Sequence, residues 1–205
     1  MTQTNSQMKK TKNTETFSMM VILLIPIAIA INVVGAQLTS LLKLPVDLDM
    51  IGVILVGALA GPIPAALAGL LTNLVNGVLD PTWLPYIPVA MCIGIAAGLL
   101  AKYNMMNTFW KICVSGLVIA IVATVTATPV TVFAFGGITG GASSVFITGL
   151  MASGKKIVES VLSVYIFTET IGKLISVLVA YLIIRVIPTR TVTKYKYGMN
   201  YISKN

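Results

Sequence analysis

The residues best suited to bind a solute are charged side chains that interrupt an apolar run near the C-terminus. Glu169 and Lys173 stand four residues apart in "YIFTETIGKLISVL", a spacing that brings both onto one face of a helix. Charged groups in such a run are costly and usually face the interior of a protein. Two interpretations stay open: a self-neutralising structural pair, or a pocket wall that hydrogen-bonds a polar ligand.

Four further candidates lie close to the ends of apolar runs. Gln37 offers an amide, and Asp49 is either a solvated charge or an acceptor for ligand donors. Trp83 and Tyr86 are either interfacial anchors or a platform on which a flat heterocycle stacks. Each of these side chains is therefore a candidate ligand contact.

Asn76 belongs to the stretch "GLLTNLVNG", where Gly69, Asn73 and Gly77 recur at four-residue spacing. Small residues at this spacing are typical of close helix packing. Asn76 stands beside this stripe and nearer the end of the run. It is a further candidate to present an amide to a ligand.

The stretch "FGGITGGASS" (Phe135–Ser144) separates two apolar runs and contains Gly137 and Thr139. Glycine exposes backbone and adopts positive φ readily. Irregular backbone beside a membrane is tolerated where protein or water satisfies its amides. We interpret the stretch as a lid over a small solute; a plain flexible linker is the alternative.

Composition places these residues in an integral membrane protein. The chain has 205 residues, of which 57% are hydrophobic and 10% charged, with a mean hydropathy of +0.94. A soluble domain would carry about a quarter charged residues. We expect no catalytic site, metal or cofactor, because the sequence has no histidine and no nucleotide-binding or nucleophile motif. The basic residues flank apolar runs, which argues against a nucleic-acid partner.

The apolar runs predict an all-α bundle of six transmembrane helices over residues 17–187. A polar tail, 1–16, precedes it and a basic tail, 188–205, follows. The break "GPIP" (Gly61–Pro64) allows either one kinked span or two short ones. Both tails are rich in lysine and arginine, so both termini should be cytoplasmic, and that requires an even number of crossings.

Two stretches carry a family resemblance: "AIAINVVGAQLTSLLKLPVDLDMIGVILVGALAGPIPAALAGLLTNLVNG" and "TPVTVFAFGGITGGASSVF". Both resemble the substrate-binding (S) subunits of energy-coupling factor (ECF) vitamin transporters. Within that family the chain is most similar to the hydroxymethylpyrimidine- or pyridoxine-type group. The resemblance implies a subunit in a bacterial cell membrane that captures a vitamin-like small molecule from outside. Cobalamin, pantothenate and riboflavin remain alternative ligands.

The resemblance also implies partners, namely a transmembrane coupling subunit and two ATPase subunits. Such subunits often dock through small residues on the first span, where this chain has Ala28 and Ala36 with Asn32 between them. A self-contained secondary transporter is a less favoured alternative, because we find no internal repeat. A membrane enzyme is disfavoured by the lack of a reactive cluster.

Overall fold

The computed structural model describes residues 17–202, and these residues form helices and connections without a β-strand. This confirms the all-α prediction. The predicted N-terminal tail, 1–16, lies outside the described residues, as do 203–205 of the predicted C-terminal tail.

Within residues 17–202, five helical stretches are long and apolar enough to cross a membrane. They are α2 (Met19–Leu41), α4 (Pro62–Leu79), α5 (Ile87–Lys102) with the 3-10 helix η2 (Pro81–Tyr86) before it, α6 (Phe109–Phe135) and α8 (Ile157–Val186). The shorter elements are α3 (Ile51–Ala60), α7 (Ala142–Ala152), α9 (Thr189–Val192) and the 3-10 helix η3 (Gly198–Tyr201).

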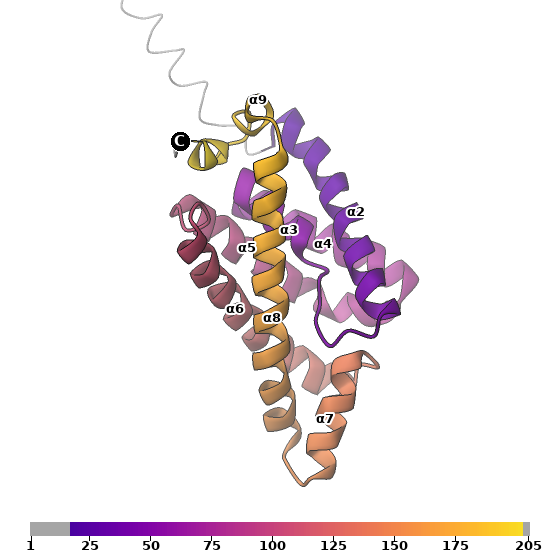
Figure 1. Cartoon of the computed structure of the whole chain (residues 1–205). Helices are drawn as coiled ribbons and strands as arrows, with labels where there is room; N and C mark the ends of the chain where they lie inside the picture. The colour runs from indigo at the N-terminus through magenta and orange to yellow at the C-terminus, as the bar shows by residue number, and fades with distance from the viewer. Residues whose placement is uncertain (1–16, 203–205) are drawn as a thin grey trace, which may run out of the picture.

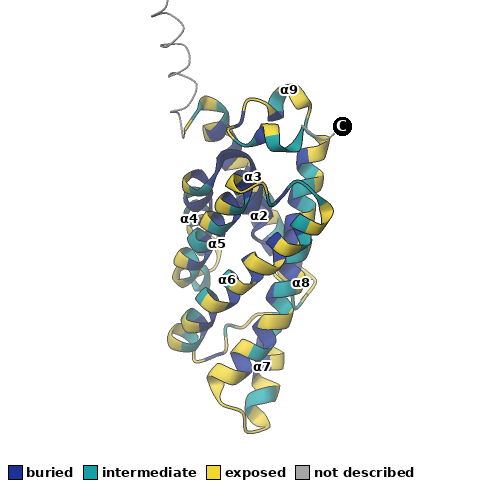
Figure 2. Cartoon of the chain, turned by 90° about the vertical axis from the view of Figure 1, so that its left-hand side faces the viewer, coloured by how far each residue is buried: buried dark blue, intermediate teal, exposed yellow. Residues whose placement is uncertain are grey.

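Helix α3 is the centre of the bundle. All of its 10 residues are buried, and Figure 2 shows it as a dark-blue helix enclosed by its neighbours. At a rise of 1.5 Å per residue it is about 15 Å long, half the thickness of a bilayer's apolar core. Gly61, with a φ of 100°, separates it from α4. The "GPIP" break therefore divides two helices rather than kinking one.

The irregular segment 43–50 runs from the end of α2 back into the bundle and leads into α3 (Figure 1). Two glycines, which have no side chain, leave room for its backbone to pass close to the neighbouring helices. Gly35 of α2 lies against the Leu48 carbonyl, and a Cβ at Gly172 of α8 would lie 2.9 Å from the Asp47 carbonyl oxygen. The segment is thus held between α2 and α8.

A buried asparagine fixes where α3 begins. The Asn32 side-chain oxygen accepts a hydrogen bond from the Gly52 backbone N–H (2.6 Å), and its amide donates to the Thr72 hydroxyl (3.0 Å). The first N–H groups of a helix have no partner within the helix. Asn32 supplies one from α2 and ties α2, α3 and α4 together.

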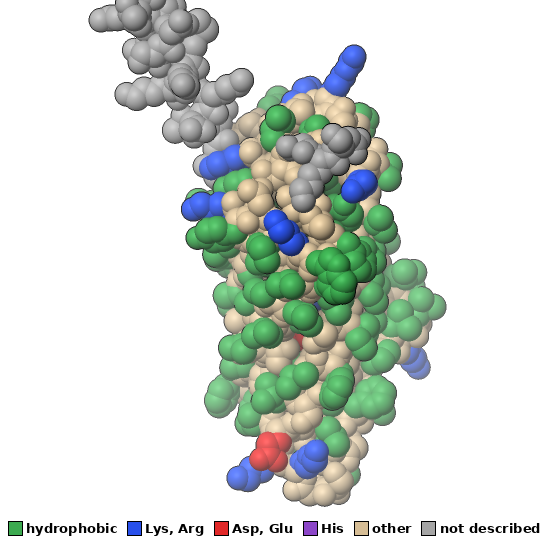
Figure 3. All heavy atoms as spheres, turned by 60° about the vertical axis from the view of Figure 1, so that its left-hand side comes forward, with side chains coloured by type: hydrophobic (Ala, Val, Ile, Leu, Met, Phe, Trp, Pro, Cys, Tyr) green, Lys and Arg blue, Asp and Glu red, His purple; other side chains and the backbone are tan. Residues whose placement is uncertain are grey.

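Both ends of the described chain lie at the same end of the bundle, and α7 lies at the other (Figure 1). Figure 3 shows an apolar band around the middle of one face, with lysine and arginine side chains gathered mainly at the end that carries the termini. Such a distribution is typical of a membrane protein with basic residues on its cytoplasmic side.

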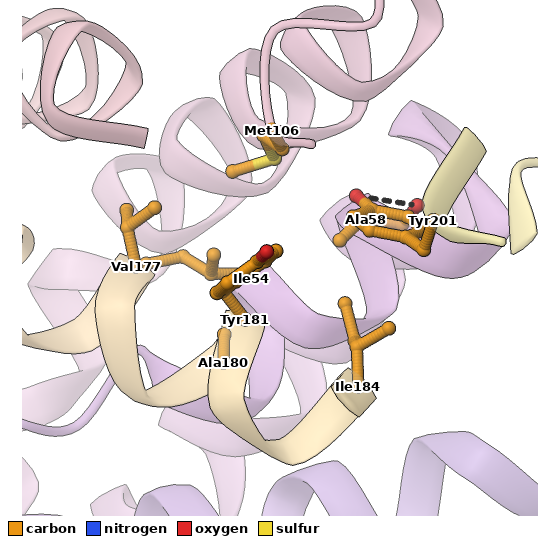
Figure 4. A pocket seen from close by; sticks show the side chains of 8 residues that line it. All are labelled: Ile54, Ala58, Met106, Val177, Ala180, Tyr181, Ile184 and Tyr201. Atoms are coloured by element: carbon orange, nitrogen blue, oxygen red, sulfur yellow. Dashed lines mark hydrogen bonds between the residues drawn. The ribbon is translucent and has the colours of Figure 1, made fainter. Parts of the chain in front are cut away.

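The chain's C-terminal segment covers the ends of α3 and α5 at the terminus-bearing end of the bundle. The Tyr197 N–H donates to the Leu59 carbonyl (3.0 Å), the Asn200 amide to the Ala101 carbonyl (3.1 Å) and the Tyr201 hydroxyl to the Ala58 carbonyl (3.4 Å). Helix-terminal carbonyls otherwise lack partners. A small apolar gap of about 10 Å³ remains beneath Tyr201 (Figure 4), room for one water molecule at most.

Candidate functional site

A cavity of about 1050 Å³ lies at the end of the bundle that carries α7. Its wall is built from segment 43–50, the ends of α2, α4 and η2, the start of α7, and inward faces of α5, α6 and α8. The volume is near the upper end of the range for small-molecule sites, which are typically apolar with a few placed polar groups. Gln37, Lys43 and Asp47 are exposed, so the cavity is accessible from outside the bundle.

Acidic and basic side chains meet in the cavity wall. The Lys173 ammonium lies 3.1 Å from a Glu169 carboxylate oxygen and 3.9 Å from an Asp49 carboxylate oxygen, and all three side chains are at most 9% exposed. The four-residue spacing on α8 explains the first contact. The second depends on segment 43–50, which carries Asp49 to the middle of α8. These are the two ion pairs among the described residues.

Asp49 lies outside the five spanning helices. Its Oδ1 atom accepts no hydrogen bond within residues 17–202.

Asn73 of α4 also lines the cavity, and neither polar atom of its amide has a hydrogen-bond partner within the described residues. Its side chain is fully buried, as is that of Asn32, whose amide is paired at both ends. An unpaired buried amide costs about 1–3 kcal/mol. Asn73 is therefore a polar group of the cavity wall that the described residues leave without a partner.

A chain of three hydroxyls stiffens the wall beside this cluster. The Thr131 hydroxyl lies 2.6 Å from the Tyr86 hydroxyl and 2.7 Å from that of Tyr165. The Tyr86 ring also stacks on Phe135, with centroids 5.8 Å apart. These contacts link η2, α6 and α8 and fix two aromatic side chains of the wall.

The glycine-rich connection contributes Thr139, Gly140 and Gly141 to the cavity wall. Gly140 has a φ of 84°, a conformation that glycine adopts without strain. The Ser144 hydroxyl accepts a hydrogen bond from the Thr139 N–H at 3.1 Å. The connection is thus folded against the start of α7 and borders the cavity.

The structure brings most of the predicted ligand contacts to this one cavity: Gln37, Asp49, Trp83, Tyr86, Thr139, Glu169 and Lys173. Two others do not line it. Asn76 is buried with its amide unpaired among the described residues. Gly137 packs near Ile157 of α8, 3.0 Å from where its Cβ would lie. A ligand role for any of these residues stays a prediction.

The residues of the predicted docking stripe are buried within the chain, and a docking role for them stays a prediction. Ala28 and Asn32 are fully buried and Ala36 is 3% exposed, because this face of α2 packs inside the chain. Gly52 of α3 lies against Ala28. In this arrangement the small residues serve packing between α2 and α3, and the outward face of α2 carries larger apolar side chains such as Ile27 and Val34.

Sequence reasoning gave too little weight to three wall residues. Tyr165 stands four residues before Glu169, so a search for residues sharing the Glu169–Lys173 face would have found it. Asn73 was interpreted as part of a packing stripe, and Gly69 of that stripe does pack closely, with its Cβ position 2.6 Å from the Ala90 carbonyl oxygen. Asp47 has no local signal for its position, which depends on the return of segment 43–50.

The fold defines a multi-helix membrane protein with a large cavity at one end. Residues 20–184 match the family described as ECF transporter, substrate-specific component. The chain therefore belongs to this family of substrate-capturing transport subunits. No curated protein and no solved structure matches the chain.

Proposed function

We propose that this chain is the S component of an ATP-driven ECF importer and captures a hydroxymethylpyrimidine- or pyridoxine-like heterocycle. The observation that carries the proposal is the cavity, in which a buried ionic cluster and aromatic side chains surround a space suited to a vitamin-sized ligand. Glu169 and Asp49 accept hydrogen bonds from ring substituents, and Trp83 at the rim offers a face for stacking. The connection 136–141 with α7 covers the bound ring.

In the proposed topology the chain crosses the membrane six times, and segment 43–50 with α3 completes the second crossing. Two observations support it: the described ends of the chain lie at one end of the bundle, and basic residues gather there. That end is cytoplasmic by the positive-inside rule. The cavity then opens on the outer face of a bacterial cell membrane, where a vitamin is met at low concentration.

The energy for uptake comes from partners, because the sequence has no nucleotide-binding motif. A transmembrane coupling subunit and two ATPase subunits supply it. Since the small-residue stripe of α2 is buried, docking uses an outward apolar face of the bundle.

Purified chain in lipid nanodiscs tests ligand capture, with pyridoxine and the hydroxymethyl aminopyrimidine as probes in titration calorimetry. We expect Glu169→Gln to weaken binding at least tenfold while folded yield is kept. Glu159→Gln is the matched control, because Glu159 is an exposed residue on the same helix. Equal loss of binding and folded yield in Glu169→Gln would favour a structural ion pair instead.

Co-expression tests the partnership. The tagged chain should co-purify with a coupling subunit and two ATPases, and uptake of the labelled vitamin should require all of them. Uptake by the chain alone would refute the proposal in favour of a self-contained transporter.

A further inference from the structure

We propose that the cavity selects a ligand with a cationic nitrogen, inserted between segment 43–50 and α8. This inference rests on the proposed capture of a small heterocycle and adds the charge of that ligand. Two observations support it: the balance of charge in the cavity wall, and polar atoms of the wall that have no hydrogen-bond partner among the described residues.

The first observation is an excess of carboxylates. Four carboxylates line the cavity, those of Asp47, Asp49, Asp80 and Glu169, and they outnumber its two ammonium groups, those of Lys43 and Lys173. Lys43 is exposed, so the cation beside the buried carboxylates is the Lys173 ammonium. That ammonium is 3.1 Å from Glu169 and 3.9 Å from Asp49. Two cations cannot neutralise four carboxylates, and the buried carboxylates of Asp49 and Glu169 share one ammonium. Buried charges need a counter-charge or a hydrogen-bond partner. A cationic ligand supplies the missing charge.

The second observation is independent of charge. Asn73 lines the same cavity with both polar atoms of its amide unpaired among the described residues, although the side chain has no solvent exposure. Asp49 Oδ1 likewise accepts no hydrogen bond there, although it lies 3.9 Å from the Lys173 ammonium. Two acceptor oxygens, Asp49 Oδ1 and Asn73 Oδ1, and the Asn73 amide N–H₂ thus have no hydrogen-bond partner among the described residues. A protonated aminomethyl heterocycle has a nitrogen with several N–H donors and, beside it, an acceptor atom. The donors bond the two oxygens, and the acceptor atom accepts from the amide N–H₂.

The size and lining of the cavity point to an organic cation rather than a metal ion. A volume of about 1050 Å³ far exceeds that of a bare ion. No group of three or more His, Cys, Asp or Glu among residues 17–202 is arranged to hold a metal. Tyr86, Tyr165 and Trp83 in the wall provide aromatic surface, which attracts both flat rings and cations.

The test uses two probe series that differ in charge on an unchanged ring. Pyridoxamine, pyridoxine and pyridoxic acid form one series; the aminomethyl and hydroxymethyl aminopyrimidines form the other. In calorimetry on the full chain in nanodiscs, we expect the amine of a series to bind at least tenfold more tightly than the alcohol. Pyridoxic acid should bind at least a hundredfold more weakly than pyridoxamine.

Asp47→Asn is the diagnostic variant, because Asp47 is exposed to the cavity and makes no ion pair or hydrogen bond among the described side chains. It should reduce the preference for amine over alcohol about tenfold and leave the alcohol's affinity within about threefold. Asp49→Asn should act in the same direction, and Glu159→Gln should change neither affinity. Thermal unfolding of each variant separates lost binding from lost folding.

The outcomes are separable. Tightest binding of the alcohol or the acid, or an unchanged preference in Asp47→Asn, overturns the charge inference but leaves ligand capture standing. If no probe binds, mass spectrometry of small molecules that co-purify decides: a basic nitrogen supports the inference, and an anionic or uncharged ligand overturns it. Binding of sodium alone, or no bound molecule of any kind, defeats capture of a heterocycle and the charge inference together.

Discussion

Asn32→Leu tests whether the start of α3 depends on a partner from α2. The substitution keeps the approximate volume of the side chain but removes the acceptor for the Gly52 N–H and the donor to Thr72. Each buried polar group left unpaired costs about 1–3 kcal/mol. Two such groups give an expected loss of about 2–6 kcal/mol in the free energy of unfolding.

Asn73→Leu is the matched comparison, because Asn73 is equally buried but pairs with no group among the described residues. Removing its amide leaves no described partner orphaned. We therefore expect a free energy of unfolding that is unchanged or higher, together with a loss of ligand affinity. Asn32→Leu should lose stability first, and its ligand affinity should follow the fraction of folded protein.

The assay is reversible unfolding by an ionic detergent, followed by circular dichroism and tryptophan fluorescence, with calorimetry for ligand affinity. A loss below about 0.5 kcal/mol in Asn32→Leu would refute the argument that this amide anchors α3, since even one orphaned group costs more. An equal loss in both variants would show that burial of an amide, and not its pairing, decides the outcome.

Two further substitutions probe the cavity wall. Gly172→Val places a branched side chain where a Cβ alone would lie 2.9 Å from the Asp47 carbonyl oxygen, so it should displace segment 43–50. We expect the free energy of unfolding to fall by about 1–3 kcal/mol. Ligand binding should weaken at least tenfold in calorimetry. Unchanged affinity would mean that segment 43–50 does not contact the ligand. Tyr86→Phe removes the hydroxyl bonded to Thr131 but keeps the ring stacked on Phe135; unfolding should cost about 0.5–1.5 kcal/mol less, with ligand affinity within about threefold.

Local patterns in the sequence predicted the helical class and the contact within α8. Glu169 and Lys173 form the expected ion pair at 3.1 Å, because four-residue spacing is enough to place two side chains together on one helix. This spacing gives no information on residues that distant parts of the chain bring to the same place. Asp49 joins the pair only because Gly35 and Gly172 admit a segment that is distant from α8 in sequence.

The sequence also did not show which side of a helix faces the cavity. Asn73 and Asn76 are three residues apart on α4, yet only Asn73 lines the cavity. The apolar character of α4 does not say which side faces the cavity. The stripe of Ala28 and Ala36 shows the same limit, since small residues predict a close neighbour without saying which. Here that neighbour is the chain's own α3.

The complete enclosure of α3 has a consequence for how the protein is assembled in its membrane. A helix of 10 residues is too short to cross the bilayer alone, and it presents no side to lipid. The insertion machinery can release α2 or α6 as free-standing segments, but α3, which has α2 beside it from the start, acquires the rest of its surroundings from helices made later, such as α5 and α8. The central helix must therefore reach its final depth late in biogenesis, after the outer helices have closed around it.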